Sequence, residues 1–337
     1  MLNFDKARYL RIQSGAIAHA EALRAAIRDA LAAGGRNLFF LGAGGAAILM
    51  QPAAQHLARR SAFPVFAEIA AELVAGGHRA LGPGSIVVIP SLSGTTKESV
   101  EALALCKARG ARVIVLTGHA GTPLADGADH AFVNFAEDDT SCESLYLQSL
   151  LIALALMAER AEIDDWDARL ADLARLPPLL VEAKRVFEPR AEALAKTLAA
   201  EPWHIITGAG SAWPQAWYYG MCILEEMQWI RTRPVHASDF FHGTLELVEP
   251  GVSVLVFKGE DPCRPLTERV ERFLPPYTDK VTVLDTAEVA LPGVDAATRA
   301  LISPVLLAAL LERLSAHLEV VRDHPLTTRR YYKRVPY

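Results

Sequence analysis

The segment 91–96 carries the most concentrated group of hydroxyl side chains in a position to bind a ligand. Its sequence is S-L-S-G-T-T, and it lies between an apolar run at 85–90 (SIVVIP) and a helical stretch at 98–108. Ligands of open α/β sheets bind where strands end, and free N–H groups at a helix N-terminus attract anions. The loop therefore predicts a phosphate site with the hydroxyls of Ser91, Ser93, Thr95 and Thr96. The alternative is an ordinary helix N-cap, which needs only one hydroxyl.

A carboxylate and an imidazole in the second half of the chain could perform acid–base chemistry. Residues 225–229 are E-E-M-Q-W, and residues 239–243 are D-F-F-H-G. On a scaffold that binds a sugar phosphate, one glutamate and His242 would suffice to move protons. The ordinary alternatives are a solvent-facing glutamate on a helix and a histidine that caps a helix before glycine.

A glycine turn at 42–45 is the third candidate. Gly44 and Gly45 would let backbone N–H groups approach a ligand at a helix N-terminus. A dinucleotide fingerprint would need glycine where Ala47 stands, and no acidic residue is evident at a strand end about 20 residues further on. The turn is therefore either an anion-binding turn or a tight connection between a strand and a helix.

The elements that must position these residues repeat within the chain. The run 37–45 (NLFFLGAGG) resembles 203–211 (WHIITGAGS), about half the chain later. Further apolar runs follow in register in each half, at 85–90 and 112–117, and at 252–257 and 280–285. Short β-branched runs that alternate with helical stretches are typical of parallel sheets. The sequence predicts an α/β protein with two similar three-layer αβα doubly wound domains in tandem.

The predicted organisation has five parts. Residues 1–34 form an N-terminal helical segment, 35–160 the first domain and 161–198 a helical linker interrupted by Pro177, Pro178 and Pro189. Residues 199–320 form the second domain. Residues 321–337 form a tail rich in arginine and tyrosine, which we expect to dock on the protein.

Composition excludes several classes of function. The chain has 337 residues, 51% of them hydrophobic, and a net charge of −5 without blocks of like charge, so we expect no nucleic-acid partner. Its four cysteines form no C-x-x-C pair, and the N-terminus has no apolar core of a signal peptide, which together favour a cytoplasmic protein. The most apolar run, 145–158, is too short to span a bilayer and predicts a buried helix, so we expect no membrane partner.

The hydroxyl loop, the internal repeat and the glutamate–histidine pair together resemble the sugar isomerase (SIS) domain superfamily over nearly the whole chain. The string E-M-Q-W…F-F-H-G and the ending R-R-Y-Y-K-R-V-P-Y are most similar to the fructosamine-6-phosphate deglycases. The isomerase domain of glucosamine-6-phosphate synthase is also similar. In that isomerase a catalytic glutamate precedes a ring-opening histidine by 16 residues, and this spacing selects Glu226 with His242 over Glu225.

The resemblance implies two further site residues and shows three departures. Ser141 falls on a serine that opens another substrate-lining helix, and Lys333 falls on a tail lysine that reaches into the site. Ala46 stands where the first glycine loop of the family often ends in serine, which removes one phosphate hydroxyl. Arg231 replaces a histidine of the synthase, and this chain lacks the synthase's glutaminase domain, so we expect no glutamine-dependent amination. Arg231 and Arg233 either favour a carboxylate-bearing amine or are surface charges.

The resemblance implies a deglycase that converts a 6-phosphorylated Amadori compound into glucose 6-phosphate and a free amino acid. The reaction is a 1,2-proton shift followed by imine hydrolysis, so we expect no metal and no cofactor. The family also implies a homodimer with the active site at the subunit interface. Two alternatives stay open: an aldose–ketose isomerase acting on a sugar phosphate, and a non-catalytic sensor that binds one.

Overall fold

The computed structural model describes residues 1–136, 142–332 and 334–336. The chain divides into two compact units. The amino-terminal unit is Ala7–Pro177, and the carboxyl-terminal unit is Pro178–Tyr337 together with Met1–Lys6.

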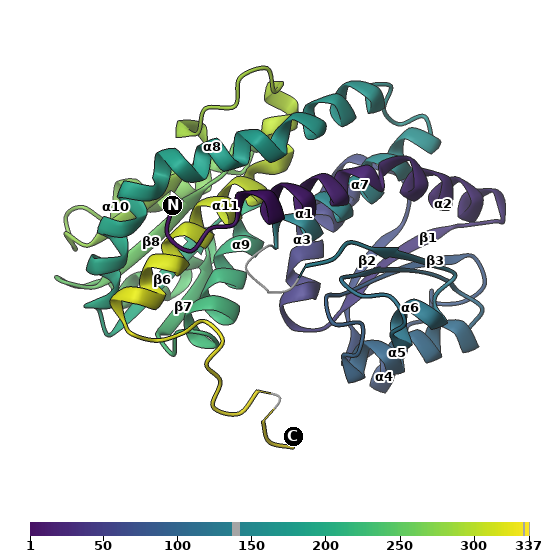
Figure 1. Cartoon of the computed structure of the whole chain (residues 1–337), viewed down its shortest axis with the longest axis horizontal. Coiled ribbons are helices and arrows are strands. Elements are labelled where there is room, and N and C mark those ends of the chain that lie inside the picture. Colours follow the sequence, from purple (N-terminus) through teal and green to yellow (C-terminus); the bar gives the residue numbers. More distant parts are fainter. Residues whose placement is uncertain (137–141, 333, 337) are drawn as a thin grey trace. The chain divides into compact units, whose positions relative to one another are not determined.

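Within its described residues, the amino-terminal unit holds a five-stranded parallel sheet in the order β2-β1-β3-β4-β5 (Figure 1). The strands are β1 (Asn37–Gly42), β2 (Val65–Ile69), β3 (Ser85–Ser91), β4 (Arg112–Thr117) and β5 (His130–Val133). Every residue of β1 and β3 is buried. Strands buried along their whole length are expected where helices cover both faces of a parallel sheet.

Helices cover both faces of this sheet. They are α1 (Lys6–Ala18), α2 (Ala20–Ala32), α3 (Gly44–Arg60), α4 (Ala70–Gly76), α5 (Lys97–Ala108), α6 (Pro123–Gly127) and α7 (Glu143–Glu159). Alternate strand residues such as Phe39 and Val87 share a core with α4, α5 and α6. Helices α2, α3 and α7 pack together on the opposite face (Figure 1). The apolar run predicted to be a buried helix is confirmed as α7, which is buried along nearly all of its length.

The order of the strands creates a switch point between β1 and β3. Strand β1 connects through α3 to β2 on one side of the sheet, whereas β3 connects through α5 to β4 on the other. The loops after two such strands run apart and leave a crevice at their carboxyl ends, where open α/β sheets bind ligands. The glycine turn after β1 and the hydroxyl loop after β3 both lie at this crevice.

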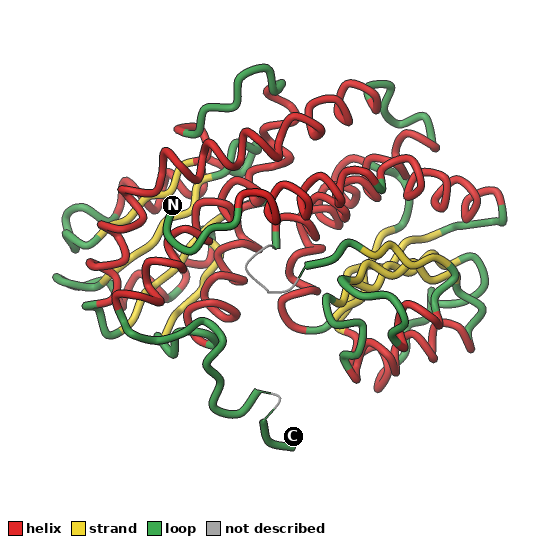
Figure 2. The backbone as a smooth tube through the Cα atoms, in the orientation of Figure 1, coloured by secondary structure: helices red, strands yellow, loops and turns green. Residues whose placement is uncertain are grey.

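The carboxyl-terminal unit repeats the same arrangement with four parallel strands among its described residues. Their order is β7-β6-β8-β9, which matches β2-β1-β3-β4. The strands are β6 (Trp203–Gly208), β7 (Arg231–His236), β8 (Ser253–Lys258) and β9 (Val281–Asp285). In each unit the strands lie between layers of helices (Figure 2). The prediction of two similar αβα units is confirmed.

The helical elements of this second half are of three kinds. The α-helices are α8 (Trp166–Ala199), α9 (Ala212–Tyr218), α10 (Arg264–Phe273) and α11 (Ala296–Val321), and η1 (Tyr219–Glu225) is a π-helix. Short 3₁₀ segments are η2 (Asp239–His242), η3 (Thr244–Leu247) and η4 (Thr286–Glu288). Helix α11 is long and apolar enough to cross a membrane, but 89% of its most apolar window is buried, so it is a core helix of this unit.

Two features differ from the sequence expectations. Helix α8 continues through Pro177, Pro178 and Pro189, which were predicted to interrupt the linker, and the two units divide within this helix. Strands β2, β5 and β7 were not predicted, because they lack the fully apolar pattern of central strands. Strand β7 lies at a sheet edge, the position where a sheet tolerates a proline such as Pro234.

Candidate active site

The hydroxyls of the loop between β3 and α5 bond to one another. The Oγ of Ser91 lies 3.1 Å from the Oγ1 of Thr96, and the hydroxyl of Thr95 donates to the Oγ of Ser93 over 3.2 Å. Ser91 is 3% exposed and also accepts from the N–H of Gly94, so it holds the loop in shape. Ser93, Thr95 and Thr96 are half-buried or exposed and can meet a ligand.

The alternative of a simple N-cap does not describe this loop. Thr96 occupies the N-cap position of α5, but its side chain makes no capping hydrogen bond. Gly94 has a positive φ of 66°, and a Cβ there would lie 2.2 Å from the Oγ1 of Thr122. Only glycine fits this position, and the loop is therefore built to a specific shape with more hydroxyls than a cap uses.

The first glycine turn lies beside this loop in the sheet. Strands β1 and β3 pair in parallel with Phe40 opposite Val88, so the turn at Gly42 and the loop at Ser91 extend from the same edge. Gly44 begins α3 with a φ of +54°, a conformation that glycine adopts without strain. Backbone N–H groups at this helix start can serve an anion in place of the hydroxyl missing at Ala46.

The equivalent crevice of the carboxyl-terminal unit is already occupied by a carboxylate of the chain. Asp261 accepts hydrogen bonds from the N–H and the Oγ of Ser211, over 2.7 and 2.6 Å, and from the N–H of Cys263 over 2.7 Å. A Cβ on Gly210 would lie 2.3 Å from this carboxylate. An internal anion thus fills the place where an external one would bind, which supports a single phosphate site per chain.

Two adjacent glutamates lie at the end of the π-helix η1, Glu225 as its last residue and Glu226 just after it, and they have different partners. Glu225 accepts from the Oγ1 of Thr232 over 2.5 Å. Glu226 accepts from the Nε of Arg329 over 2.9 Å, and the side chains of this pair are 28% and 13% exposed, respectively. The neighbouring apolar residues Met221–Leu224, Met227 and Trp229 predict a poorly solvated carboxylate. In the structure the cationic partner of Glu226 is Arg329.

The tail packs against the segment that carries Glu226. The Nε2 of Gln228 donates to the carbonyl of His324 over 2.7 Å, and Arg322 donates to the carbonyl of Gln228 over 3.2 Å. Trp229 has a positive φ of 55°, which is a strained conformation for tryptophan. Its ring contacts two tail residues, with the His324 ring centroid at 4.4 Å and the Arg330 guanidinium at 3.9 Å.

His242 ends the 3₁₀ segment η2. Phe240 of the same segment is fully buried, packs on Phe273 and fixes the backbone, which leaves His242 exposed. Gly243 follows with a φ of 155°. Within the part of the chain that the structure describes, the imidazole of His242 forms no hydrogen bond, so it is free of a capping role.

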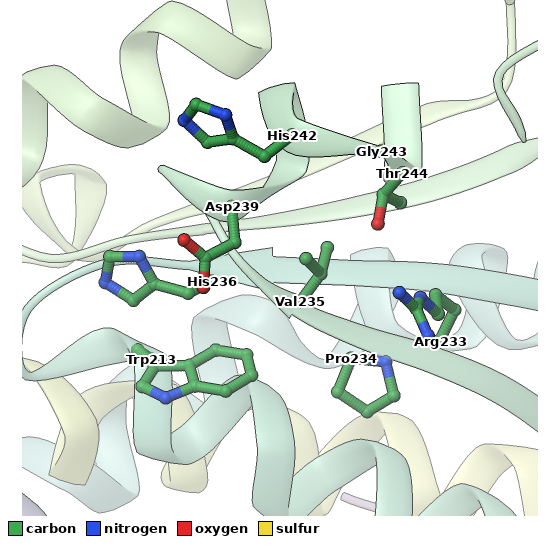
Figure 3. Close-up of a pocket in the computed structure, with 9 residues that line it drawn as sticks. All are labelled: Trp213, Arg233, Pro234, Val235, His236, Asp239, His242, Gly243 and Thr244. Carbon is green, nitrogen blue, oxygen red and sulfur yellow. The ribbon is translucent and has the colours of Figure 1, made fainter. Parts of the chain in front are cut away.

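His242 opens onto a cavity of about 510 Å³ in the carboxyl-terminal unit (Figure 3). The residues that line it come from α9, β7, η2 and η3: Trp213, Arg233, Pro234, Val235, His236, Asp239, His242, Gly243 and Thr244. Glu226 is not among these residues. The two predicted catalytic residues therefore do not both line this cavity.

Two predicted site residues, Ser141 and Lys333, lie outside the described residues. Among residues 1–136, 142–332 and 334–336, no group of three or more His, Cys, Asp or Glu side chains is arranged to hold a metal ion.

The sequence analysis missed two residues at these sites, Arg329 and His236. Arg329 lies in the tail and bonds to Glu226, but Lys333 was the only tail residue predicted to reach the site. The arginine pair at 329–330 in the sequence was the signal that could have pointed to it. His236 ends β7, a strand that was not predicted, and its ring packs edge-on against Trp213 with centroids 5.8 Å apart. Recognising β7 would have placed His236 at the carboxyl end of a strand, where ligands bind.

Comparisons with known proteins agree with this architecture. The SIS domain family matches residues 33–158. The fructosamine deglycase of Bacillus subtilis (strain 168) is 28% identical over 304 residues, which are 89% of this chain and 92% of that protein. The fructoselysine 6-phosphate deglycase of Escherichia coli (strain K12) is 30% identical over 286 residues, which are 83% of this chain and 80% of that protein.

Solved structures give the same result. A candidate phosphosugar isomerase from Bacillus subtilis superimposes with a TM-score of 0.89 at 28% identity, covering 96% of this chain and 99% of that one. The C-terminal domain of glucosamine-fructose-6-phosphate aminotransferase from Francisella tularensis shares the fold, with a TM-score of 0.81 at 15% identity over 96% of this chain and 97% of that one. The chain therefore belongs to the SIS domain family, as a tandem SIS protein that resembles the fructosamine-6-phosphate deglycases.

Proposed function

We propose that the chain is a deglycase that cleaves a 6-phosphorylated Amadori compound into glucose 6-phosphate and a free amino acid. The observation that carries the proposal is similarity over 83% to 89% of the chain to proteins named as deglycases of fructosamine and of fructoselysine 6-phosphate. The proposed enzyme acts in the cytoplasm as a homodimer.

The phosphate site of the proposed enzyme is the loop 91–96 with the glycine turn at Gly44 and Gly45. The half-buried or exposed hydroxyls of Ser93, Thr95 and Thr96 donate to the phosphate oxygens, and the N-termini of α3 and α5 contribute positive dipole ends. Ser91 keeps the loop in shape. Binding energy from the phosphate orients the carbons that react.

The proposed chemistry is a proton shift followed by hydrolysis. His242 transfers a proton to the ring oxygen as the ring opens and the C2 carbonyl forms. Glu226 removes a proton from C1 while the C2 carbonyl oxygen takes up a proton from water, which gives an enaminol. A proton added at C2 and the loss of the proton on nitrogen then give an imine between C1 and the amine nitrogen. Water adds to this C1=N bond, the amino acid leaves, and glucose 6-phosphate remains. No step exchanges electrons with another molecule, so the reaction is redox-neutral as written.

The resemblance to SIS enzymes, in which the site often lies at a subunit interface, supports the assignment of His242 to the site of the neighbouring subunit. His242 is exposed on a cavity whose lining does not include Glu226. In the proposed homodimer, each site combines Glu226 of one subunit with His242 of its partner.

An aldose–ketose isomerase is the second candidate, favoured by the solved structure described as a candidate phosphosugar isomerase. It would use the same proton shift without an amine. A panel of fructosamine 6-phosphate, unphosphorylated fructosamine and fructose 6-phosphate separates the possibilities, with glucose or glucose 6-phosphate as the product measured. A deglycase releases glucose 6-phosphate from the first compound. An isomerase converts only fructose 6-phosphate, and a sensor binds these compounds without turnover.

A further inference from the structure

The cavity around His242 has a cation, Arg233, that no group among the described residues neutralises. Arg233 is exposed and, among the described residues, forms no ion pair or hydrogen bond. The carboxylate of Asp239, which lines the same cavity, accepts instead from the Oγ of Ser238 over 3.2 Å. His236 directs its Nδ1 to the same serine. The guanidinium of Arg233 is therefore available to a ligand.

The pleat of β7 determines where this guanidinium lies. Side chains alternate between the faces of a strand, so Arg233 and Val235 share one face. Val235 packs in the same core as Phe240 of η2, the segment that bears His242. Pro234 belongs to the other face, where a Cβ on Gly220 would lie 2.7 Å from its Cγ. Arg233 thus projects to the face on which His242 lies.

The cavity is large enough to hold a further part of the substrate besides the sugar ring atoms on which His242 would act. Its volume of about 510 Å³ lies within the ~300–1,000 Å³ range of small-molecule sites. Trp213, Pro234 and Val235 provide apolar walls, and Arg233 provides a planar fork of donors suited to a carboxylate (Figure 3).

We infer that this cavity binds the amino-acid part of the substrate, with Arg233 pairing to its α-carboxylate. The inference rests on the proposed deglycase function and narrows its substrate class. In an Amadori compound formed on an α-amino group, the carboxylate is one carbon from the amine nitrogen. In a compound formed on the ε-amino group of lysine, the carboxylate lies farther away and has an ammonium beside it. The preferred substrates are therefore 6-phosphofructosyl derivatives of α-amino groups.

The test compares three 6-phosphorylated compounds: the fructosyl derivatives of glycine, of glycinamide and of the lysine ε-amino group. Glycinamide keeps the size of glycine and removes its charge. We expect wild-type protein to have a kcat/KM roughly 10- to 100-fold higher for the glycine compound than for the other two, as expected for hydrogen bonds to a charged group.

Variants locate the source of this preference. Arg233→Gln should reduce the ratio between the glycine and glycinamide compounds to about one. Arg231 is the matched control, because it is exposed on the same face of β7 but does not line the cavity. Arg231→Gln should keep the wild-type ratio. A wild-type ratio near one, a ratio unchanged in Arg233→Gln, or an equal loss in both variants would overturn the inference while leaving the deglycase function intact.

Absence of turnover with all three compounds would refute the deglycase function instead. In that case, isothermal titration calorimetry with the glycine and glycinamide compounds tests the carboxylate site independently of turnover. A Kd ratio of roughly 10 to 100 that Arg233→Gln removes supports the carboxylate site, and equal Kd values for the two compounds contradict it.

Discussion

Replacing Arg329 by glutamine tests whether the tail positions the proposed catalytic base. The Nε of Arg329 donates to the Oε1 of Glu226 over 2.9 Å. Its Nη1 also donates to the carbonyls of Leu326 and Thr328, over 2.6 and 3.0 Å, so the guanidinium is held on the tail while it holds the carboxylate. Glutamine at this position removes the positive charge and the guanidinium group that makes these contacts.

The size of the effect follows from this geometry. A hydrogen bond to a charged group contributes about 1.5–3 kcal/mol in favourable cases. The two side chains are 28% and 13% exposed, so water screens the pair in part and the lower end of that range applies. A loss of about 1.5 kcal/mol in the transition state corresponds to roughly a tenfold lower kcat/KM. We expect most of this loss in kcat, because the contact orients the base and does not bind the sugar.

Steady-state release of glucose 6-phosphate measures the effect, with Arg330→Gln as the matched control. Arg330 is the next residue and carries the same charge, but its guanidinium lies 3.9 Å from the centre of the Trp229 ring. Arg329→Lys should restore part of the activity because it returns the charge. An Arg329→Gln enzyme as active as wild type, or a loss no greater than in Arg330→Gln, would refute the positioning role.

Three further predictions test other parts of the account. Ser93→Ala or Thr96→Val should each weaken binding of the phosphorylated substrate by about 1.5–3 kcal/mol, with little change in Tm. If both variants keep the kcat/KM of wild type, the loop is a structural turn and does not bind phosphate. Mixing inactive Glu226→Gln with inactive His242→Ala subunits should restore some activity, whereas an active monomer by light scattering would contradict the shared site. Burial lowers the pKa of His204 from 6.5 to about 4, so the folded state favours the neutral ring and is fully stabilised above pH 6.5. This stabilisation, up to about 3 kcal/mol, should be lost as the pH falls to 4, and urea unfolding at several pH values should show a smaller loss in His204→Asn.

The fold was largely predictable because its central strands carry a strong signal. Runs such as 85–90 and 252–257 are almost entirely apolar, which is typical of parallel strands covered by helices on both faces. The edge strand β7 was not predictable in this way. Its sequence, R-T-R-P-V-H, mixes exposed arginines with a proline, and only its place beside β6 makes it a strand.

The part of the candidate site whose residues all lie in one short segment of the sequence was predictable. The loop 91–96 displays its hydroxyls and its glycine together, and the structure brings these hydroxyls into contact. Contacts across long sequence separations were not predictable. Arg329 is 103 residues from Glu226, and no local pattern links the tail to the end of a π-helix. Arg231 and Arg233 were equivalent in the sequence, and only the pocket geometry separates them.

Release of glucose 6-phosphate from fructosamine 6-phosphate by wild type, Glu226→Gln and Glu225→Gln tests the central claim most directly. The two glutamates are adjacent, but Glu225 bonds to Thr232 and Glu226 to Arg329, so the pair provides an internal control. The account predicts release by wild type and by Glu225→Gln, and a kcat at least roughly 10²–10⁴-fold lower in Glu226→Gln with little change in KM. Wild-type protein that releases no glucose 6-phosphate, or a Glu226→Gln variant as active as Glu225→Gln, would contradict it.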